Sequence, residues 1–151
     1  MAWAVPAISL ATAAPALATS HGPDQLKITR FKARYIRKRR GVRVITGPIR
    51  NKGQSSAGQV TAVVTFPIRR KGPFRRPPKV SGRVSRGWSL VGRREGYNLT
   101  FVTNSEIEAG DRTQPLIFTV VTAGGKKRFS KGTVRLVVNG NDSSDTASSR
   151  L

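Results

Sequence analysis

Carboxylates are the first candidates for chemistry in this 151-residue chain. Among its seven acidic residues, Glu106, Glu108 and Asp111 form the one cluster, in a connection between two apolar runs. Two facing carboxylates roughly 5 to 10 Å apart across a cleft could hydrolyse a glycosidic bond. The cluster lacks the dense Asp and Asn spacing of a calcium loop. Solvated loop charges beside Arg112 are the simpler interpretation, and a small hydrolase is the enzymatic alternative.

The only histidine, His21, lies close to the N-terminus in a segment that we expect to be flexible. With no second histidine in the chain, we expect neither a histidine-based triad nor a multi-histidine metal site. Cysteine is absent, which excludes disulfides, thiolate metal sites and thiol redox chemistry. The sequence therefore predicts a protein without a catalytic residue, a metal or a cofactor.

Lysine and arginine give the strongest signal, because 28 of them face 7 acidic residues and the formal net charge is +21. They gather in two predicted loops, and the planar fork of arginine binds phosphate or carboxylate groups through paired hydrogen bonds. We expect the two loops to form one polyanion-binding site, made of Arg37, Lys38, Arg39, Arg40, Arg69, Arg70, Lys71, Arg75 and Arg76. A solvated basic surface without a dedicated ligand is the alternative interpretation.

The positive charge is concentrated in the first half of the chain. Between Asp24 and Glu95, seventy residues contain 21 Lys or Arg and no acid, whereas residues 95–151 carry seven bases and six acids. Such a charge distribution attracts polyanions. Salt screens exposed charges beyond about 8 Å at physiological ionic strength, so binding should weaken as salt rises.

The elements expected to position these loops are β-strands. After the N-terminal stretch no long pattern has a helical period, and 15 glycines and 9 prolines interrupt the chain at short intervals. Apolar residues instead alternate with polar ones, as in strands with one buried face. The clearest strands fall in 58–67 (GQVTAVVTFP), 96–104 (GYNLTFVTN), 115–122 (PLIFTVVT) and 133–139 (TVRLVVN).

The first half of the chain predicts two strands joined by a charged turn. In 26–36 (LKITRFKARYI) the apolar face changes near Arg30, which a β-bulge would explain. The turn is RKRRG at 37–41, and the strand 42–51 (VRVITGPIRN) is kinked at Gly47 and Pro48. Because proline cannot donate a ladder hydrogen bond, we expect this strand at a sheet edge or bulged. Residues 79–88 are the weakest strand candidate.

About seven short strands separated by turn residues predict an all-β fold, an immunoglobulin-like antiparallel β-sandwich. The sandwich is expected to span residues 26–139, with Trp88 in its core. Residues 19–25 should be a flexible lead-in. The polar segment 140–151 has too few apolar side chains to bury, so it should be disordered.

Two stretches carry a resemblance to known domains. The stretch VITGPIRNKGQSSAGQVTAVVTFP resembles the strand, Asn-x-Gly, strand pattern of bacterial cell-surface adhesion-related domains, which have immunoglobulin-like folds. The stretch SEIEAGDRTQPLIFTVV resembles their Ile-x-x-Gly pattern followed by an apolar strand. The resemblance implies an immunoglobulin-like fold and an envelope location, and those families supply no catalytic positions to transfer.

The first eighteen residues, MAWAVPAISLATAAPALA, contain no charge and end in small residues of the kind that a signal peptidase recognises. We interpret residues 1–18 as an export leader, although the usual positive segment before the apolar run is missing. A buried alanine-rich helix is the alternative, which Pro6 and Pro15 disfavour. The stretch resembles the distal half of leaders on exported actinobacterial proteins, many of which carry twin arginines upstream.

Together these features predict an exported, non-catalytic domain that associates with anionic cell-envelope polymers through basic loops. Nucleic acid is the alternative polyanion, since it also binds by phosphate neutralisation. Only Tyr35 and Phe74 lie near basic runs, however, where single-strand binders place aromatic rings that stack on bases. A structural spacer without a ligand and a membrane-surface role are further alternatives.

Overall fold

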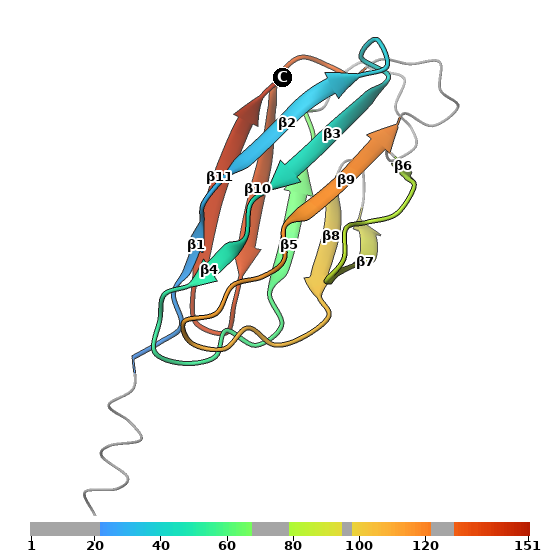
Figure 1. Ribbon diagram of the computed structural model, residues 1–151. Helices are drawn as coiled ribbons and strands as arrows, with labels where there is room; N and C mark the ends of the chain where they lie inside the picture. The colour runs from blue at the N-terminus through green and yellow to red at the C-terminus, as the bar shows by residue number, and fades with distance from the viewer. Residues whose placement is uncertain (1–21, 68–78, 95–97, 122–128) are drawn as a thin grey trace, which may run out of the picture.

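The computed structural model describes residues 22–67, 79–94, 98–121 and 129–151, which form an all-β domain (Figure 1). The described residues contain eleven strands and no helix. The strands are β1 (Leu26–Ile28), β2 (Phe31–Ile36), β3 (Gly41–Thr46), β4 (Ile49–Asn51), β5 (Thr61–Thr65), β6 (Lys79–Ser81), β7 (Trp88–Arg94), β8 (Asn98–Thr103), β9 (Leu116–Val121), β10 (Thr133–Asn139) and β11 (Ser144–Arg150).

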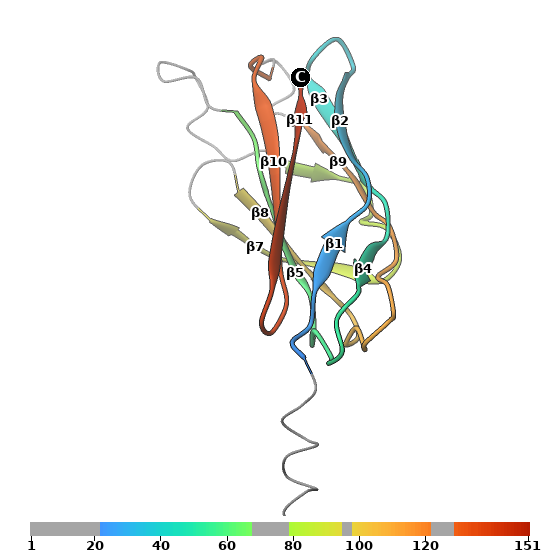
Figure 2. The same ribbon diagram turned by 90° about the vertical axis from the view of Figure 1, so that its left-hand side faces the viewer.

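The strands form two layers that pack face to face, as the side view shows (Figure 2). One layer has the strand order β2-β3-β9-β6, and the short pair β1-β4 extends its β2–β3 hairpin. The other layer has the order β11-β10-β5-β8-β7. All named strand pairs are antiparallel. The structure therefore confirms the predicted antiparallel β-sandwich, with eleven strands in place of about seven.

The strand order is that of an immunoglobulin-like domain with one addition. The order β2-β3-β9-β6 corresponds to strands A-B-E-D of that fold, and β11-β10-β5 corresponds to G-F-C. The β7–β8 hairpin is added beyond β5. The segment 79–88, expected as one strand, instead contains β6 and the first residue of β7, because an irregular connection separates them.

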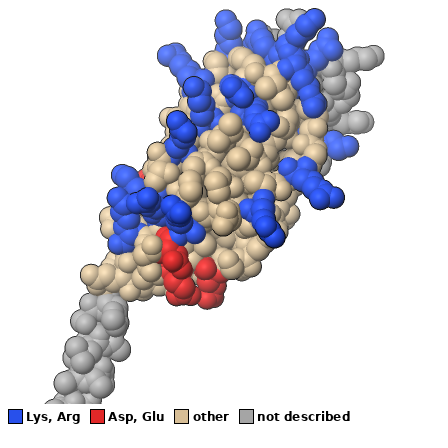
Figure 3. Space-filling view, viewed as in Figure 1, with Lys and Arg blue, Asp and Glu red and all other residues tan. Residues whose placement is uncertain are grey.

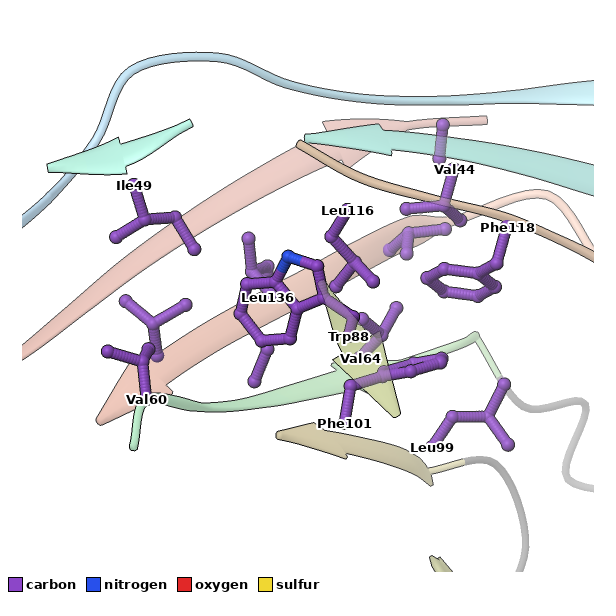
Figure 4. Close-up of a cluster of buried hydrophobic side chains, with 14 of the residues drawn as sticks. Val44, Ile49, Val60, Val64, Trp88, Leu99, Phe101, Leu116, Phe118 and Leu136 are labelled. Carbon is purple, nitrogen blue, oxygen red and sulfur yellow. The ribbon is translucent and has the colours of Figure 1, made fainter. Parts of the chain in front are cut away.

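The core forms where the inward residues of both layers meet (Figure 4). Alternation selects these residues: β5, β8, β9 and β10 each bury every second side chain. Phe101 of β8 and Phe118 of β9 join the layers, with ring centroids 4.4 Å apart. The buried Trp88 donates from Nε1 to the Gln114 carbonyl at 2.8 Å, which confirms its predicted place in the core.

The N-terminal hairpin, residues 26–51, runs the length of the sandwich and breaks once on each strand. The break between β1 and β2 falls at Thr29 and Arg30, and that between β3 and β4 at Gly47 and Pro48, as the sequence predicts. The Gly47 amide donates to the Arg30 carbonyl at 2.9 Å, so the two breaks lie opposite each other. Of the two alternatives expected for this strand, the edge position does not hold for β3, which lies between β2 and β9. The strand is instead interrupted at Gly47 and Pro48, which places the proline outside the ladder.

The C-terminal segment corrects a second expectation. Residues 140–151 were expected to be disordered, but residues 144–150 form β11, paired with the whole of β10. Three side chains of this segment accept hydrogen bonds at 2.8–3.0 Å from backbone amides of the N-terminal hairpin. Ser143, just before β11, accepts from Leu26, and Asp145 and Ser149 within β11 accept from Ile28 and Ala33. Polar residues are thus what this strand requires, because its inner side chains supply acceptors to a neighbouring strand edge.

The lead-in to β1 is also ordered where the structure describes it. Asp24 lies in the part of residues 19–25 expected to be flexible, yet it is 1% exposed. Its carboxylate accepts hydrogen bonds from the Asp142 amide at 2.7 Å and the Ser143 hydroxyl at 2.6 Å. These bonds fix the beginning of the hairpin to the start of β11.

Candidate polyanion-binding surface

The first predicted basic loop, residues 37–40, is the tight turn between β2 and β3 (Figure 1). Arg37, Lys38 and Arg40 are exposed there, whereas Arg39 is partly buried. The second predicted loop, with Arg69, Arg70, Lys71, Arg75 and Arg76, lies outside the described residues. The predicted joining of the two loops into one site therefore stays a prediction.

Three consecutive turn residues adopt the left-handed backbone conformation. The φ angles of Arg37, Lys38 and Arg39 are 52°, 54° and 69°. This conformation is unfavourable for residues with a Cβ atom, because Cβ lies too close to the following carbonyl oxygen, and glycine or, less often, asparagine is the usual choice. Basic side chains are therefore held here against the local backbone preference, which is a pattern found at functional turns.

Arg39 anchors the turn to the body of the domain. Its carbonyl accepts from the Phe129 amide at 2.7 Å, and its Nη2 donates to the Phe129 carbonyl at 3.2 Å. Its guanidinium lies 5.1 Å from the centre of the Tyr35 ring, and the Tyr35 hydroxyl donates to the Ser130 carbonyl at 3.0 Å. Arg39 thus has a structural role, and the other three turn cations face solvent.

The strained turn gives the first testable prediction. Lys38→Gly should raise the free energy of unfolding by about 0.5–1 kcal/mol because glycine tolerates positive φ, and Lys38→Val should lower it by about 1–2 kcal/mol. At the exposed Lys32 of β2 the effects should be reversed, since strands favour valine over glycine. Lys32→Gly should lower the free energy of unfolding, and Lys32→Val should raise it. Urea unfolding of the four variants checks the reversal, and equal signs at both positions would contradict it.

Strand alternation brings further cations onto the outer face of the β1–β4 and β2–β3 hairpin. Residues 26–51 contain ten Lys or Arg and no acidic residue. Nine of these ten side chains are exposed, namely Lys27, Arg30, Lys32, Arg34, Arg37, Lys38, Arg40, Arg43 and Arg50. Figure 3 shows Lys and Arg side chains spread over this side of the domain, and a group of acidic side chains at the end away from the turn.

Pairing places several of these cations directly opposite one another. Arg34 of β2 and Arg43 of β3 are register partners. Lys27 pairs with Arg50 across β1 and β4, and Arg50 pairs with Arg112 through an isolated bridge. Like charges directly opposite each other destabilise a sheet. We call Lys27, Arg50 and Arg112 the cation row, and Arg34 with Arg43 the arginine pair.

A shallow polar hollow of about 690 Å³ adjoins the cation row. It is lined by Arg50, Arg112, Asp111, Gln114 and the turn residues around them. Arg50 of β4 and Arg112 of the β8–β9 connection could contact one anionic group together. Because Asp111 also lines the hollow, part of this positive charge is offset locally.

The outer face of the other layer differs in chemistry. Threonine, serine, valine and asparagine occupy most of the outward positions of β5, β8, β10 and β11. Arg135 of β10 and Arg150 of β11 are exposed, and their register partners are Ser148 and Thr133. Among the side chains that the structure describes on β5, β8, β10 and β11, Arg135 and Arg150 are thus the only cations, and they provide a matched control for the hairpin face.

Sequence reasoning missed the residues of this face because it searched for basic runs. The sequence neighbours of these cations are uncharged on both sides, so none belongs to a run of basic residues: Lys27, Lys32, Arg34, Arg43 and Arg50. The available signal was their position in the alternation. In a strand whose apolar residues face the core, the intervening cations must share the outer face.

The carboxylates singled out for hydrolysis lie on a loop surface. Glu106, Glu108 and Asp111 are all exposed, and neither glutamate lines the hollow beside Arg112. No group of three or more His, Cys, Asp or Glu positioned to hold a metal is found in the described part of the chain. His21 lies outside the described residues.

Comparison with known proteins gives no family assignment. No protein-family model matches the chain, and no curated protein matches it significantly. Within the described ranges, no helix is long and apolar enough to cross a membrane. The surface chemistry of the described face is therefore the basis for assigning a function.

Proposed function

We propose that this protein is an exported, non-catalytic domain that binds an anionic polymer of the cell envelope. The observation that carries the proposal is the hairpin 26–51, with ten cations, no acid and nine exposed basic side chains. The neighbouring β6 adds the exposed Lys79 to the same layer. Export rests on the apolar leader 1–18, which lies outside the described residues. The basic turn 37–40 belongs to this surface, and the 69–76 loop is proposed to extend it.

The chemistry of the face favours a flexible anionic polymer over single-stranded nucleic acid. Proteins that bind single strands without sequence preference stack bases on exposed aromatic rings. No aromatic side chain is classed as exposed in the ranges that the structure describes. Tyr35 is only partly exposed, and the guanidinium of Arg39 lies over its ring. The described part of this surface therefore offers electrostatic contact and no exposed ring on which a base could stack.

Retention by purified cell walls tests the proposed function. We expect the full-length protein to bind walls at about 50 mM salt and to lose at least about tenfold in affinity at about 500 mM, because binding releases condensed counterions. Duplex and single-stranded DNA are tested in parallel by gel shift at about 150 mM salt. Absent or salt-insensitive retention would contradict the proposal, and tighter binding to DNA than to walls would favour the nucleic-acid alternative.

A further inference from the structure

We propose that the ligand is a linear phosphate-bearing polymer that lies along the outer face of hairpin 26–51. It would contact the cation row, the arginine pair and the 37–40 turn at the same time. This inference rests on the proposed function and specifies the ligand class and the track that it follows.

The three groups of cations lie one after another along the hairpin. Lys27 of the cation row and Arg34 of the arginine pair are seven residues apart, which at about 3.3 Å per residue is about 23 Å along the strand direction. Lys38 of the turn lies four residues beyond Arg34, at most about 14 Å further. The break at Thr29 and Arg30 shortens the first distance somewhat. A compact anion reaches one group, whereas a linear polymer reaches all three.

The strands of the β2-β3-β9-β6 layer carry no acidic side chain along the track. Lys32 of β2 lies opposite Ile45 of β3, and Ile45 lies opposite Ile117 of β9. Both isoleucines are partly exposed and Lys32 is exposed. No acidic residue occurs in β2, β3, β6 or β9. A polyanion can therefore pass from the cation row to the arginine pair without meeting a carboxylate on these strands.

The arginine pair favours phosphate over carboxylate. Directly opposed residues of an antiparallel pair have Cβ atoms about 4.5–5.5 Å apart, so two guanidinium groups can approach one anion. A planar carboxylate has two oxygens whose lone pairs all lie in one plane, so a second guanidinium must approach in the same plane as the first. A tetrahedral phosphate presents its oxygens in several directions and can accept from Arg34 and Arg43 together. The same reasoning applies to Arg50 and Arg112 of the cation row.

Binding should also relieve a cost that the free protein carries. The opposed arginines Arg34 and Arg43 repel each other across the β2–β3 pair. A phosphate between the two guanidinium groups replaces their repulsion with two attractive contacts. We therefore expect the polymer to raise the thermal unfolding midpoint, as any ligand that binds only the folded state does.

Polyphosphate chains of defined length test the linear track. Chains with an extended length below about 23 Å should bind weakly to the full-length protein, and longer chains should bind at least tenfold more tightly, because the second contact becomes intramolecular. Polyglutamate chains of the same lengths are the carboxylate control and should bind at least tenfold more weakly than polyphosphate. Calorimetry and the thermal midpoint give two independent readouts.

Two matched double variants locate the track. Arg34→Gln with Arg43→Gln should weaken the rise in affinity with chain length and move its onset to chains that reach from the cation row to the 37–40 turn, about 37 Å. Arg135→Gln with Arg150→Gln removes the same charge from the opposite face and should preserve the rise. All four side chains are exposed, so both variants should remain folded. Urea titration should show little change for the Arg135 and Arg150 variant and a gain of up to about 1 kcal/mol for the Arg34 and Arg43 variant, which loses the repulsion.

The outcomes separate this inference from the proposed function. Three outcomes would overturn the linear phosphate track and leave anionic-polymer binding intact. They are polyphosphate affinity that does not depend on chain length, equal affinity for polyglutamate, and equal loss of affinity in both double variants. Failure to bind any polyanion would overturn both. Poly(glycerol phosphate) and oligo-dT of equal charge then distinguish the source: preference for the first supports an envelope polymer, and preference for the second overturns that assignment.

Discussion

Deletion of residues 140–151 is expected to unfold the domain, although this segment is the most polar stretch of the described chain. The deletion removes β11, which pairs with all seven residues of β10, and leaves β10 with β5 as its one neighbour in the sheet. It also removes the acceptors for the amides of Leu26, Ile28 and Ala33. We expect a loss of more than about 5 kcal/mol, which is comparable with the whole stability of a typical domain.

The measurement is circular dichroism with soluble yield. The exposed edge of β10 should also make the truncated protein aggregate, because unpaired strand edges join other chains. A truncated protein that remained soluble and melted cooperatively near the temperature of the intact one would show that β11 is dispensable.

Alanine substitutions at alternate positions of β11, and at the residue before it, test the same contacts without removing the strand. Ser143, Asp145 and Ser149 face the β1 and β2 edge, whereas residues 144, 146 and 148 are exposed. Replacing the three inner residues with alanine should cost about 3 kcal/mol, at about 1 kcal/mol for each backbone amide left without its acceptor. Replacing Ser144, Thr146 and Ser148 with alanine should cost no more than about 1 kcal/mol. Equal costs in urea unfolding would contradict the role assigned to the inner residues.

Asn51→Ala is expected to destabilise the domain by about 3–5 kcal/mol. The side chain is 1% exposed. Its Oδ1 accepts from the amides of Gln25 and Gly53 at 3.1 and 3.0 Å. Its Nδ2 lies 2.8–3.3 Å from the carbonyls of Ser55, Ile107 and Glu108, to which it donates. One amide group thus holds three separate chain segments at this end of the sandwich.

Asn51→Ala leaves buried backbone groups without partners, and this desolvation penalty is the main cost. Asn139→Ala, at an exposed position of β10, is the matched control and should change the free energy of unfolding by no more than about 0.5 kcal/mol. Urea unfolding measures both. A loss below about 1 kcal/mol for Asn51→Ala would show that the loops are held by other contacts.

Asn51 and Ile107 also explain the two stretches that resemble cell-surface domains. The Asn-x-Gly pattern begins with Asn51, and Gly53 is the third residue. A Cβ atom at Gly53 would lie 2.3–2.5 Å from the backbone of residues 23–25, so only glycine fits there. Ile107, the first residue of the Ile-x-x-Gly pattern, is buried. Both patterns therefore report how loops pack at one end of the fold.

Local patterns in the sequence were sufficient for much of the architecture. The alternation of Val134, Leu136 and Val138 marks a strand with one buried face, and several such strands must cover one another as two layers. The charged turn at 37–40 and the break at Gly47 and Pro48 were also predicted, because turns and prolines act on a few neighbouring residues. Local patterns did not predict β11, because its side-chain oxygens accept hydrogen bonds from backbone amides more than 110 positions away in the sequence.

The sequence by itself determined a sandwich of alternating strands and a strongly basic first half, because burial of every second residue and the net charge depend only on residue order and composition. The tertiary structure decided which cations stand together. Arg34 meets Arg43, and Arg50 meets Arg112, through strand register. Register is a long-range property, set by how the whole buried face fits its partner layer. For that reason the basic surface follows a hairpin face and extends well beyond the basic runs in the sequence.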